Sequence, residues 1–185
     1  MDKNQGRIKN LPNHLSILRL ALIPAVVICL YFPGRMGSFL AALFFGIAAL
    51  TDLLDGFYAR RYRVVTALGK FLDPLADKIL ISVTMIMLLT LNRIPTWIVM
   101  VIVARELAVT GLRSIAVVEG QVIDASALGK YKFIFQVVAL LCLSLHYQYL
   151  QIDFHVVGMV FLWVALVLTV WSGWVYFRLA KRMLF

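Results

Sequence analysis

Ionisable residues, and acidic ones above all, are scarce in this chain of 185 residues. It holds nine Asp and Glu against 18 Lys and Arg, and charged residues make up only 15% of the whole. Apolar residues make up 63%, whereas soluble domains are closer to half apolar. The composition excludes an ordinary soluble domain and indicates an integral membrane protein, small enough to form one domain over residues 1–185.

Several other features are missing from the sequence. There is no low-complexity tract, long linker or convincing internal repeat. The first apolar run carries Arg19 and Pro24 and is not followed by a clear signal-cleavage site, so we expect no cleavable signal peptide. The two cysteines, Cys29 and Cys142, both lie within apolar runs, where we expect them to pack rather than react.

Alternation of polar and apolar residues is also missing, which argues against a membrane β-barrel. In lipid the backbone must satisfy its own hydrogen bonds, so long continuous apolar runs predict helices. A span needs about 20 residues. We therefore predict an all-α bundle of six transmembrane helices, at about 15–33, 38–59, 72–91, 95–117, 130–150 and 155–177.

The basic residues predict how the bundle is oriented. Thirteen of the 18 flank one set of span ends, and only Arg35 and Arg93 flank the other. The positive-inside rule then predicts that both termini are cytoplasmic. Residues 1–14 predict a basic interfacial segment, with a turn at Asn10–Asn13 before the first span. The net charge of +9 suggests anionic headgroups and substrates rather than nucleic acid.

Four of the nine acidic residues lie close together, at Asp52, Asp55, Asp73 and Asp77. A carboxylate at the centre of a membrane helix costs about 2.5–3.5 kcal/mol on insertion scales. On helices, Asp52 and Asp55 share one face of the second span, and Asp73 and Asp77 share one face at the start of the third. Four convergent carboxylates predict a site for one divalent cation or a close pair, such as Mg²⁺ or Mn²⁺.

Small residues accompany the aspartates. Gly56, Ala59 and Gly69 would let a neighbouring helix or a flat ligand approach closely, and Arg60 can grip a phosphate with its planar fork. The alternative is an intramembrane ion-pair network in which nearby Lys and Arg neutralise the aspartates. That alternative leaves the two glycines unexplained.

Taken together, these residues form the pattern Asp52-x2-Asp55-Gly56-x2-Ala59-Arg60-x8-Gly69-x3-Asp73-x3-Asp77. The pattern resembles the signature of the CDP-alcohol phosphatidyltransferase family at all eight fixed positions. The resemblance implies six transmembrane helices, a divalent metal held by the four aspartates, and a CDP-linked donor bound by Gly56, Ala59, Arg60 and Gly69. It also implies transfer to an alcohol with release of CMP, Asp77 as the base, and a homodimer.

Within this family, the chain is most similar to bacterial members that use CDP-diacylglycerol and glycerol 3-phosphate to make phosphatidylglycerophosphate. The similarity extends over about residues 8–177, and Phe133 departs from it where threonine is common. It implies a bacterial inner membrane location, with the active site facing the cytoplasm. It rests on the segments 10–19, 23–24, 104–106, 111–113 and 129–132, together with Gln136.

The acceptor is a small dianion, and four basic residues are predicted to bind its phosphate: Arg105, Arg113, Lys130 and Lys132. The alternatives are ordinary positive-inside flanking for the lysines and an acidic partner for Arg105. Adjacent helical residues point about 100° apart, so we do not expect Arg105 to pair with Glu106. Arg19 is predicted either to hold donor phosphate or a lipid headgroup, or to snorkel to the interface.

Other functions remain possible at this point. A relative could use another acceptor, such as inositol phosphate or serine, or a CDP-choline-type donor. A cation or proton transporter also carries intramembrane acids, but it needs a path to both faces. A lipid-binding scaffold would have no need of four aspartates at metal-ligand spacing.

Overall fold

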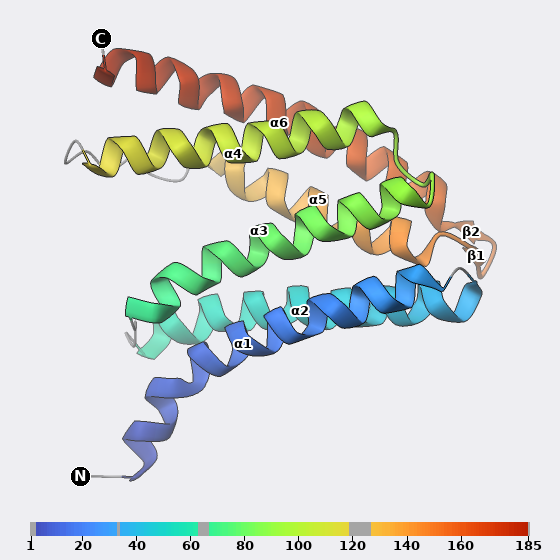
Figure 1. Cartoon of the computed structure of the whole chain (residues 1–185), viewed down its shortest axis with the longest axis horizontal. Helices are drawn as coiled ribbons and strands as arrows, with labels where there is room; N and C mark the ends of the chain where they lie inside the picture. Colours follow the sequence, from blue (N-terminus) through green and yellow to red (C-terminus); the bar gives the residue numbers. More distant parts are fainter. Residues whose placement is uncertain (1–2, 33, 63–66, 119–126, 185) are drawn as a thin grey trace.

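The computed structural model describes residues 3–32, 34–62, 67–118 and 127–184, and it describes side chains over 17–32, 34–51, 75–116 and 128–179. Within these ranges the chain is a bundle of helices with one small hairpin (Figure 1). The elements in chain order are α1 (Lys3–Tyr31), α2 (Arg35–Tyr62), α3 (Ala67–Thr90), α4 (Thr96–Val118), α5 (Ala127–Leu145), β1 (Gln148–Tyr149), β2 (Ile152–Asp153) and α6 (Phe154–Leu184).

The helices pack as two groups joined by α5. The first three helices contact one another, α4 packs on α6, and α5 contacts α2, α3 and α6. Both chain ends lie at the same end of the bundle, at the left of Figure 1. The start of α3 and the start of α5 lie at that end too, so these two helices run in the same direction.

Every predicted span overlaps one helix, but several boundaries differ from the prediction. α1 is helical from Lys3, so the predicted turn at Asn10–Asn13 is wrong. A proline inside a helix removes one backbone donor and can bend the helix without ending it. The predicted spans also leave residues 60–71 between the second and the third span, whereas α2 continues to Tyr62 and α3 starts at Ala67.

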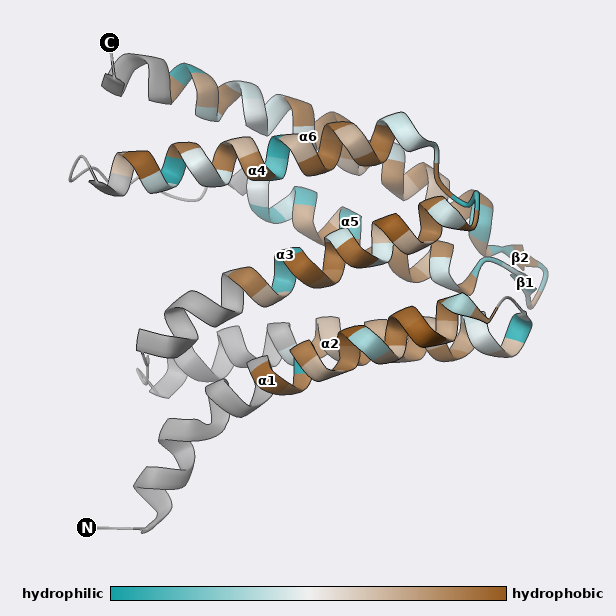
Figure 2. Ribbon diagram, in the orientation of Figure 1, coloured by the Kyte–Doolittle hydropathy of each residue, from teal (hydrophilic) through white to brown (hydrophobic). Residues whose placement is uncertain are grey.

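Hydrophobic residues cover much of the described helices, as Figure 2 shows. The core contains Phe45, Met85, Ile98, Leu140 and Leu162, all fully buried. In the described part, Leu128–Leu145 and Phe154–Leu179 are long and apolar enough to cross a membrane. An apolar stripe at helical spacing is exposed along α6, as expected of a face that contacts lipid: Val156, Val160, Trp163, Val167, Val170 and Trp174.

A β-hairpin joins α5 to α6 at the end of the bundle away from the termini. Tyr149 pairs with Ile152, and the two loop residues Leu150 and Gln151 both have positive φ, as a type I′ turn requires. Neither residue is the Asn or Gly that usually announces such a turn. The sequence therefore gave no reason to expect the hairpin, and the predicted span over 130–150 ran into it.

Arg93 links α2 and α5 at the same end of the bundle through hydrogen bonds. It lies in the turn between α3 and α4 and is almost completely buried. Its guanidinium donates to the carbonyl oxygens of Leu143 (3.3 Å) and Ser144 (3.0 Å) and to Ser38 Oγ (2.8 Å). One cation thus joins the start of α2, the turn before α4 and the last carbonyls of α5.

We expect Arg93→Ala to lower the thermal unfolding midpoint in detergent by about 5 to 15 °C, because it leaves buried carbonyl groups without a charged donor. Arg35→Ala is the matched control, because Arg35 is exposed at the same end and contacts the Tyr147 ring. The control should lose about 2 °C or less. Equal losses in the two variants would contradict the fastening role of Arg93.

Candidate active site

The signature residues occupy the adjoining ends of two consecutive helices. Asp52 and Asp55 fall in the last part of α2, and Asp73 and Asp77 fall in the first part of α3. α2 and α3 contact each other. Asp77 is the signature residue whose side chain the structure describes. The side chains of the other seven lie outside the described residues: Asp52, Asp55, Gly56, Ala59, Arg60, Gly69 and Asp73.

Asp77 forms an ion pair with Arg19 of α1. Arg19 is 0% exposed, so it does not snorkel to the interface, and that alternative is wrong. An arginine is carried into an apolar core only when its charge is compensated. The pair therefore fixes α1 against α3 at the position of the predicted base.

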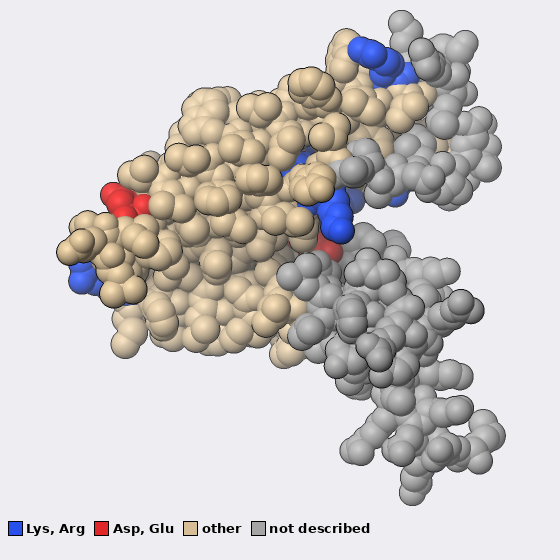
Figure 3. Space-filling model, turned by 180° about the vertical axis from the view of Figure 1, so that it is seen from behind, with Lys and Arg blue, Asp and Glu red and all other residues tan. Residues whose placement is uncertain are grey.

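A cavity of about 180 Å³ opens beside Asp77, between α3, α4 and α5. It has carboxylates and ammonium groups together with neutral polar and apolar walls. The side chains that line it are Asp77, Lys78, Ile81, Ser82, Glu106, Lys132, Phe133 and Gln136. Figure 3 shows basic side chains beside an acidic one where the described surface is hollowed.

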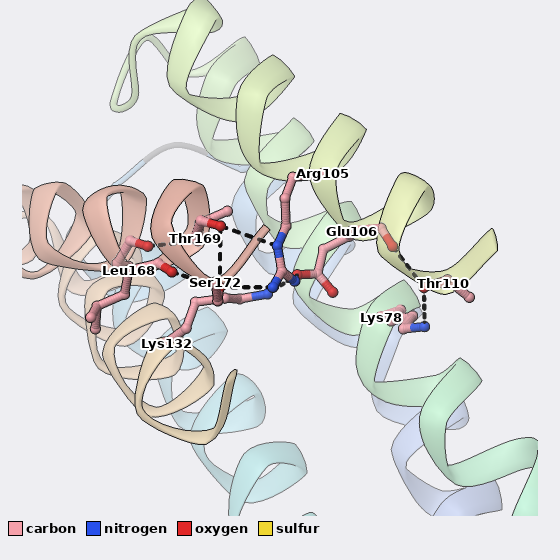
Figure 4. Close-up of polar contacts among 9 residues, drawn as sticks. Lys78, Arg105, Glu106, Thr110, Lys132, Leu168, Thr169 and Ser172 are labelled. Carbon is pink, nitrogen blue, oxygen red and sulfur yellow. Dashed lines mark hydrogen bonds and ion pairs between the residues drawn. The ribbon is translucent and has the colours of Figure 1, made fainter. Parts of the chain in front are cut away.

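Glu106 links α4 to α5 at this cavity, and its neighbour Arg105 contacts α6 (Figure 4). Its Oε1 accepts a hydrogen bond from Arg105 Nη1 at 2.9 Å and forms an ion pair with Lys132 Nζ of α5. The expectation that neighbouring Arg105 and Glu106 would not pair is therefore wrong. The Cβ vectors do diverge, but the long arginine side chain turns back because α6 holds its other nitrogens.

Arg105 is held mainly by α6. Its Nε donates to the Thr169 carbonyl oxygen (3.2 Å), its Nη2 donates to Ser172 Oγ (2.7 Å), and its guanidinium lies 5.8 Å from the centre of the Tyr176 ring. Gly173 leaves room for the arginine, since an added Cβ would lie 3.1 Å from Arg105 Cγ. Arg105 is absent from the described lining of the cavity but contacts the lining residue Glu106, and its role as a phosphate ligand stays a prediction.

The other three predicted phosphate ligands differ in burial. Lys132 is buried and lines the cavity, whereas Lys130 and Arg113 are exposed. Since Lys130 and Lys132 are two residues apart on a helix, they cannot share one face. Their roles as phosphate ligands stay predictions.

Lys78 also lines the cavity, although it was not predicted to be a site residue. Its Nζ donates to Thr110 Oγ1 at 2.5 Å, and Thr110 in turn donates to the Glu106 carbonyl oxygen at 2.6 Å. Within the described side chains, no carboxylate forms an ion pair with Lys78. A cationic group held by a neutral hydroxyl in a cavity suits an anionic ligand.

Ser82, Glu106 and Gln136 were not predicted to be site residues either. Helical spacing carried a usable signal, because Ser82 lies four residues after Lys78 and Gln136 lies four residues after Lys132. What the sequence could not give is which faces of α3 and α5 meet. That depends on the packing of α5 between the two helix groups.

A larger hollow of about 620 Å³ lies elsewhere, on α6. Val170, Trp171, Trp174 and Val175 form most of its lining, and Arg178 is the charged residue among the described lining side chains. It has no carboxylate or other catalytic group in that lining. We therefore assign the chemistry to the smaller cavity at Asp77.

Comparison with known proteins now identifies the family. The sequence profile of the CDP-alcohol phosphatidyltransferases matches residues 9–171. The chain is 43% identical over 184 residues to CDP-diacylglycerol–glycerol-3-phosphate 3-phosphatidyltransferase of Bacillus subtilis (strain 168), covering 91% of this chain and 93% of the relative. The chain belongs to the CDP-alcohol phosphatidyltransferase family.

Two further relatives are similar over nearly their whole length. One carries the same name in Rickettsia bellii (strain RML369-C) and is 38% identical, with 94% of this chain and 97% of the relative covered. The other is a probable phosphatidylglycerophosphate synthase of Mycobacterium tuberculosis (strain CDC 1551 / Oshkosh), 39% identical, with 96% and 85% covered. The resemblance drawn from the signature is thus confirmed.

We expect two matched glycine substitutions in helices to differ in their effects on the unfolding midpoint and on activity. Gly111→Ala adds a methyl group that meets nothing within 4 Å, so it should raise the unfolding midpoint by about 2–4 °C, as alanine is the better helix former. Gly173→Ala presses on Arg105, so its midpoint should be lower than that of Gly111→Ala, and its activity should fall as Glu106 shifts. Equal midpoints and unchanged activity would show that Arg105 is not constrained by α6.

Proposed function

We propose that the protein transfers the phosphatidyl group of CDP-diacylglycerol to glycerol 3-phosphate, giving phosphatidylglycerophosphate and CMP for phosphatidylglycerol and cardiolipin synthesis. The observation that carries the proposal is the cavity at Asp77, where a carboxylate base faces the two ammonium groups of Lys78 and Lys132. The printed names of the relatives from Bacillus and Rickettsia point to the same reaction.

The chemical step uses Asp77 as general base. Its carboxylate takes the proton from the 1-hydroxyl of glycerol 3-phosphate, and the oxygen forms a bond to the phosphatidyl phosphorus. The bond from that phosphorus to the bridging oxygen breaks, and CMP leaves with the electron pair. Arg19 holds the carboxylate in place before the acceptor arrives.

The donor site draws on the signature. Gly56, Ala59 and Gly69 give the nucleotide room, and Arg60 contacts its phosphates. The diacylglycerol tails stay in the bilayer, reached from the side of the bundle. The signature positions lie on the adjoining ends of α2 and α3, which supports transfer from a donor bound there to an acceptor at Asp77.

A divalent cation, Mg²⁺ or Mn²⁺, fits the donor set. The described side chains contain no group of three or more His, Cys, Asp and Glu that could hold a metal, but three of the four aspartates lie outside them. Asp52, Asp55, Asp73 and Asp77 would hold the ion, because carboxylate oxygens are the ligands hard cations prefer. When bound, it supplies charge stabilisation for the leaving phosphate.

The acceptor phosphate binds between Lys78 and Lys132, with Lys130 and Arg113 drawing the dianion toward the cavity from the exposed surface. Arg105 acts indirectly, through Glu106. An acceptor panel tests this choice: glycerol 3-phosphate should be used at least 10-fold better than inositol phosphate or serine. A preference for another alcohol would show that the protein is a family member with a different acceptor.

We also propose six transmembrane spans in the bacterial inner membrane, with both termini and the active site on the cytoplasmic side. The protein is proposed to act as a homodimer. Both chain ends lie at the end of the bundle where α3 starts, which supports a shared side for termini and site. Labelling of single cysteines in intact cells tests the topology, and a protected N-terminal cysteine is the expected result.

Mass measurement in nanodiscs tests the dimer, and a strictly monomeric active enzyme would exclude it.

Asp77→Asn should lower the rate of CMP release by about 10²–10⁴-fold, the usual contribution of a general base. Asp153→Asn is the control, because Asp153 Oδ1 accepts from the backbone nitrogens of His155 and Val156 at the far end of the bundle. Asparagine caps a helix as well as aspartate, so the control should stay active. Near-normal turnover of purified Asp77→Asn would remove Asp77 as the base.

Removal of divalent metal should abolish CMP release, and Mg²⁺ or Mn²⁺ should restore it. The four carboxylates require a cation to balance their charge when the donor pyrophosphate binds. Full activity in excess EDTA, after dialysis against chelator, would exclude the metal while leaving the transfer reaction itself in place.

A further inference from the structure

Gln136 has no role in the proposed reaction so far, yet it is placed like a ligand-binding residue. It lies in α5, is 1% exposed, and lines the cavity beside Asp77. Its Nε2 has no hydrogen-bond partner among the described residues. Burying an amide donor without a partner is costly, so a donor held at a cavity wall calls for a ligand acceptor.

The cavity has two levels. Lys132 and Gln136 lie four residues apart on α5, and Lys78 and Ser82 lie four residues apart on α3, so each pair shares one helix face. Both helices start at the same end of the bundle, so Ser82 lies about 6 Å farther along α3 than Lys78, and Gln136 lies about 6 Å farther along α5 than Lys132. The charged level thus holds Asp77, Lys78, Glu106 and Lys132, and the neutral level holds Ser82 and Gln136.

This division restricts what each level can bind. A phosphate belongs at the charged level, since a buried anion needs cationic partners. The neutral level has a carboxamide and a hydroxyl, which together donate and accept hydrogen bonds and carry no net charge. Ile81 and Phe133 close the walls around them. A neutral hydroxyl group satisfies such a level, and a second charge does not.

We propose that Gln136, assisted by Ser82, binds the 2-hydroxyl of the acceptor and selects a phosphorylated vicinal diol. This rests on the proposed function, which places the 1-hydroxyl at Asp77 and the phosphate at the lysines. The remaining hydroxyl, on carbon 2, then meets the neutral level. A site that hydrogen-bonds a substrate hydroxyl discriminates strongly against an analogue without it.

The test compares sn-glycerol 3-phosphate with 3-hydroxypropyl phosphate, which lacks only the 2-hydroxyl, by CMP release from CDP-diacylglycerol. Gln136→Met keeps length and volume and removes a partnerless buried amide, so the protein should remain folded. We expect kcat/KM for glycerol 3-phosphate to fall about 10- to 100-fold, while the value for 3-hydroxypropyl phosphate changes less than about 3-fold. Ser82→Ala should give a smaller change in the same direction.

Thr84→Val is the matched control. Thr84 is also buried on α3, and its Oγ1 has no partner among the described residues, but it does not line the cavity. It should leave the ratio between the two acceptors unchanged. Equal losses with both acceptors in Gln136→Met, or no loss with either, would overturn the assignment of Gln136 while leaving the transfer reaction standing. If the unaltered protein does not use glycerol 3-phosphate, the proposed function fails first, and this inference with it.

Discussion

The compensation of charge inside an apolar bundle is the constraint on which the rest of this structure depends. Hydrocarbon does not solvate ions, so each buried cation must find an acceptor from another part of the chain. Arg19 finds Asp77, Lys132 finds Glu106, and Arg93 finds the last carbonyls of α5. Each of these contacts joins different helices, so the same requirement that makes charge costly also holds the bundle in register.

The contacts at the two ends differ in kind. Arg93 binds backbone carbonyls and a serine hydroxyl, partners that no substrate can replace. Asp77 and Lys132 are paired with charged side chains and also line the cavity. A phosphate bound in this cavity would compete with Glu106 for Lys132, whereas the partners of Arg93 are part of the backbone and of α2. The far end is therefore suited to permanent structure, and the end that carries the signature is suited to exchange.

Much of the architecture could be predicted from hydropathy and spacing, because membrane helices must be long, apolar and internally hydrogen-bonded. Each predicted span overlaps one helix, and the signature positions fall on α2 and α3. The hairpin could not be predicted, because Leu150 and Gln151 adopt positive φ without the residues that favour it. The start of α1 was missed because Pro12 was read as a helix boundary.

The site was less predictable than the fold, and Arg105 illustrates the reason. Its residue type predicted a phosphate ligand, but its position in the structure depends on contacts with Thr169 and Ser172, more than 60 residues away. Residue type and spacing describe what one helix can present, whereas a cavity is decided by which faces of several helices meet.

The pairing of Lys132 with Glu106 has a consequence for how an anionic acceptor can be bound and then released. Lys132 and Asp77 are already paired, with Glu106 and Arg19, so an arriving phosphate would add negative charge to a site whose carboxylates are balanced. Lys78, whose Nζ donates to Thr110, adds positive charge that can offset this excess. Arg105 also contacts Glu106, so this carboxylate would keep a cationic partner if Lys132 turned to a phosphate. The network would thus allow Lys132 to change partners while Glu106 keeps a cationic contact with Arg105. A transferase whose charged product must leave needs such a reversible contact.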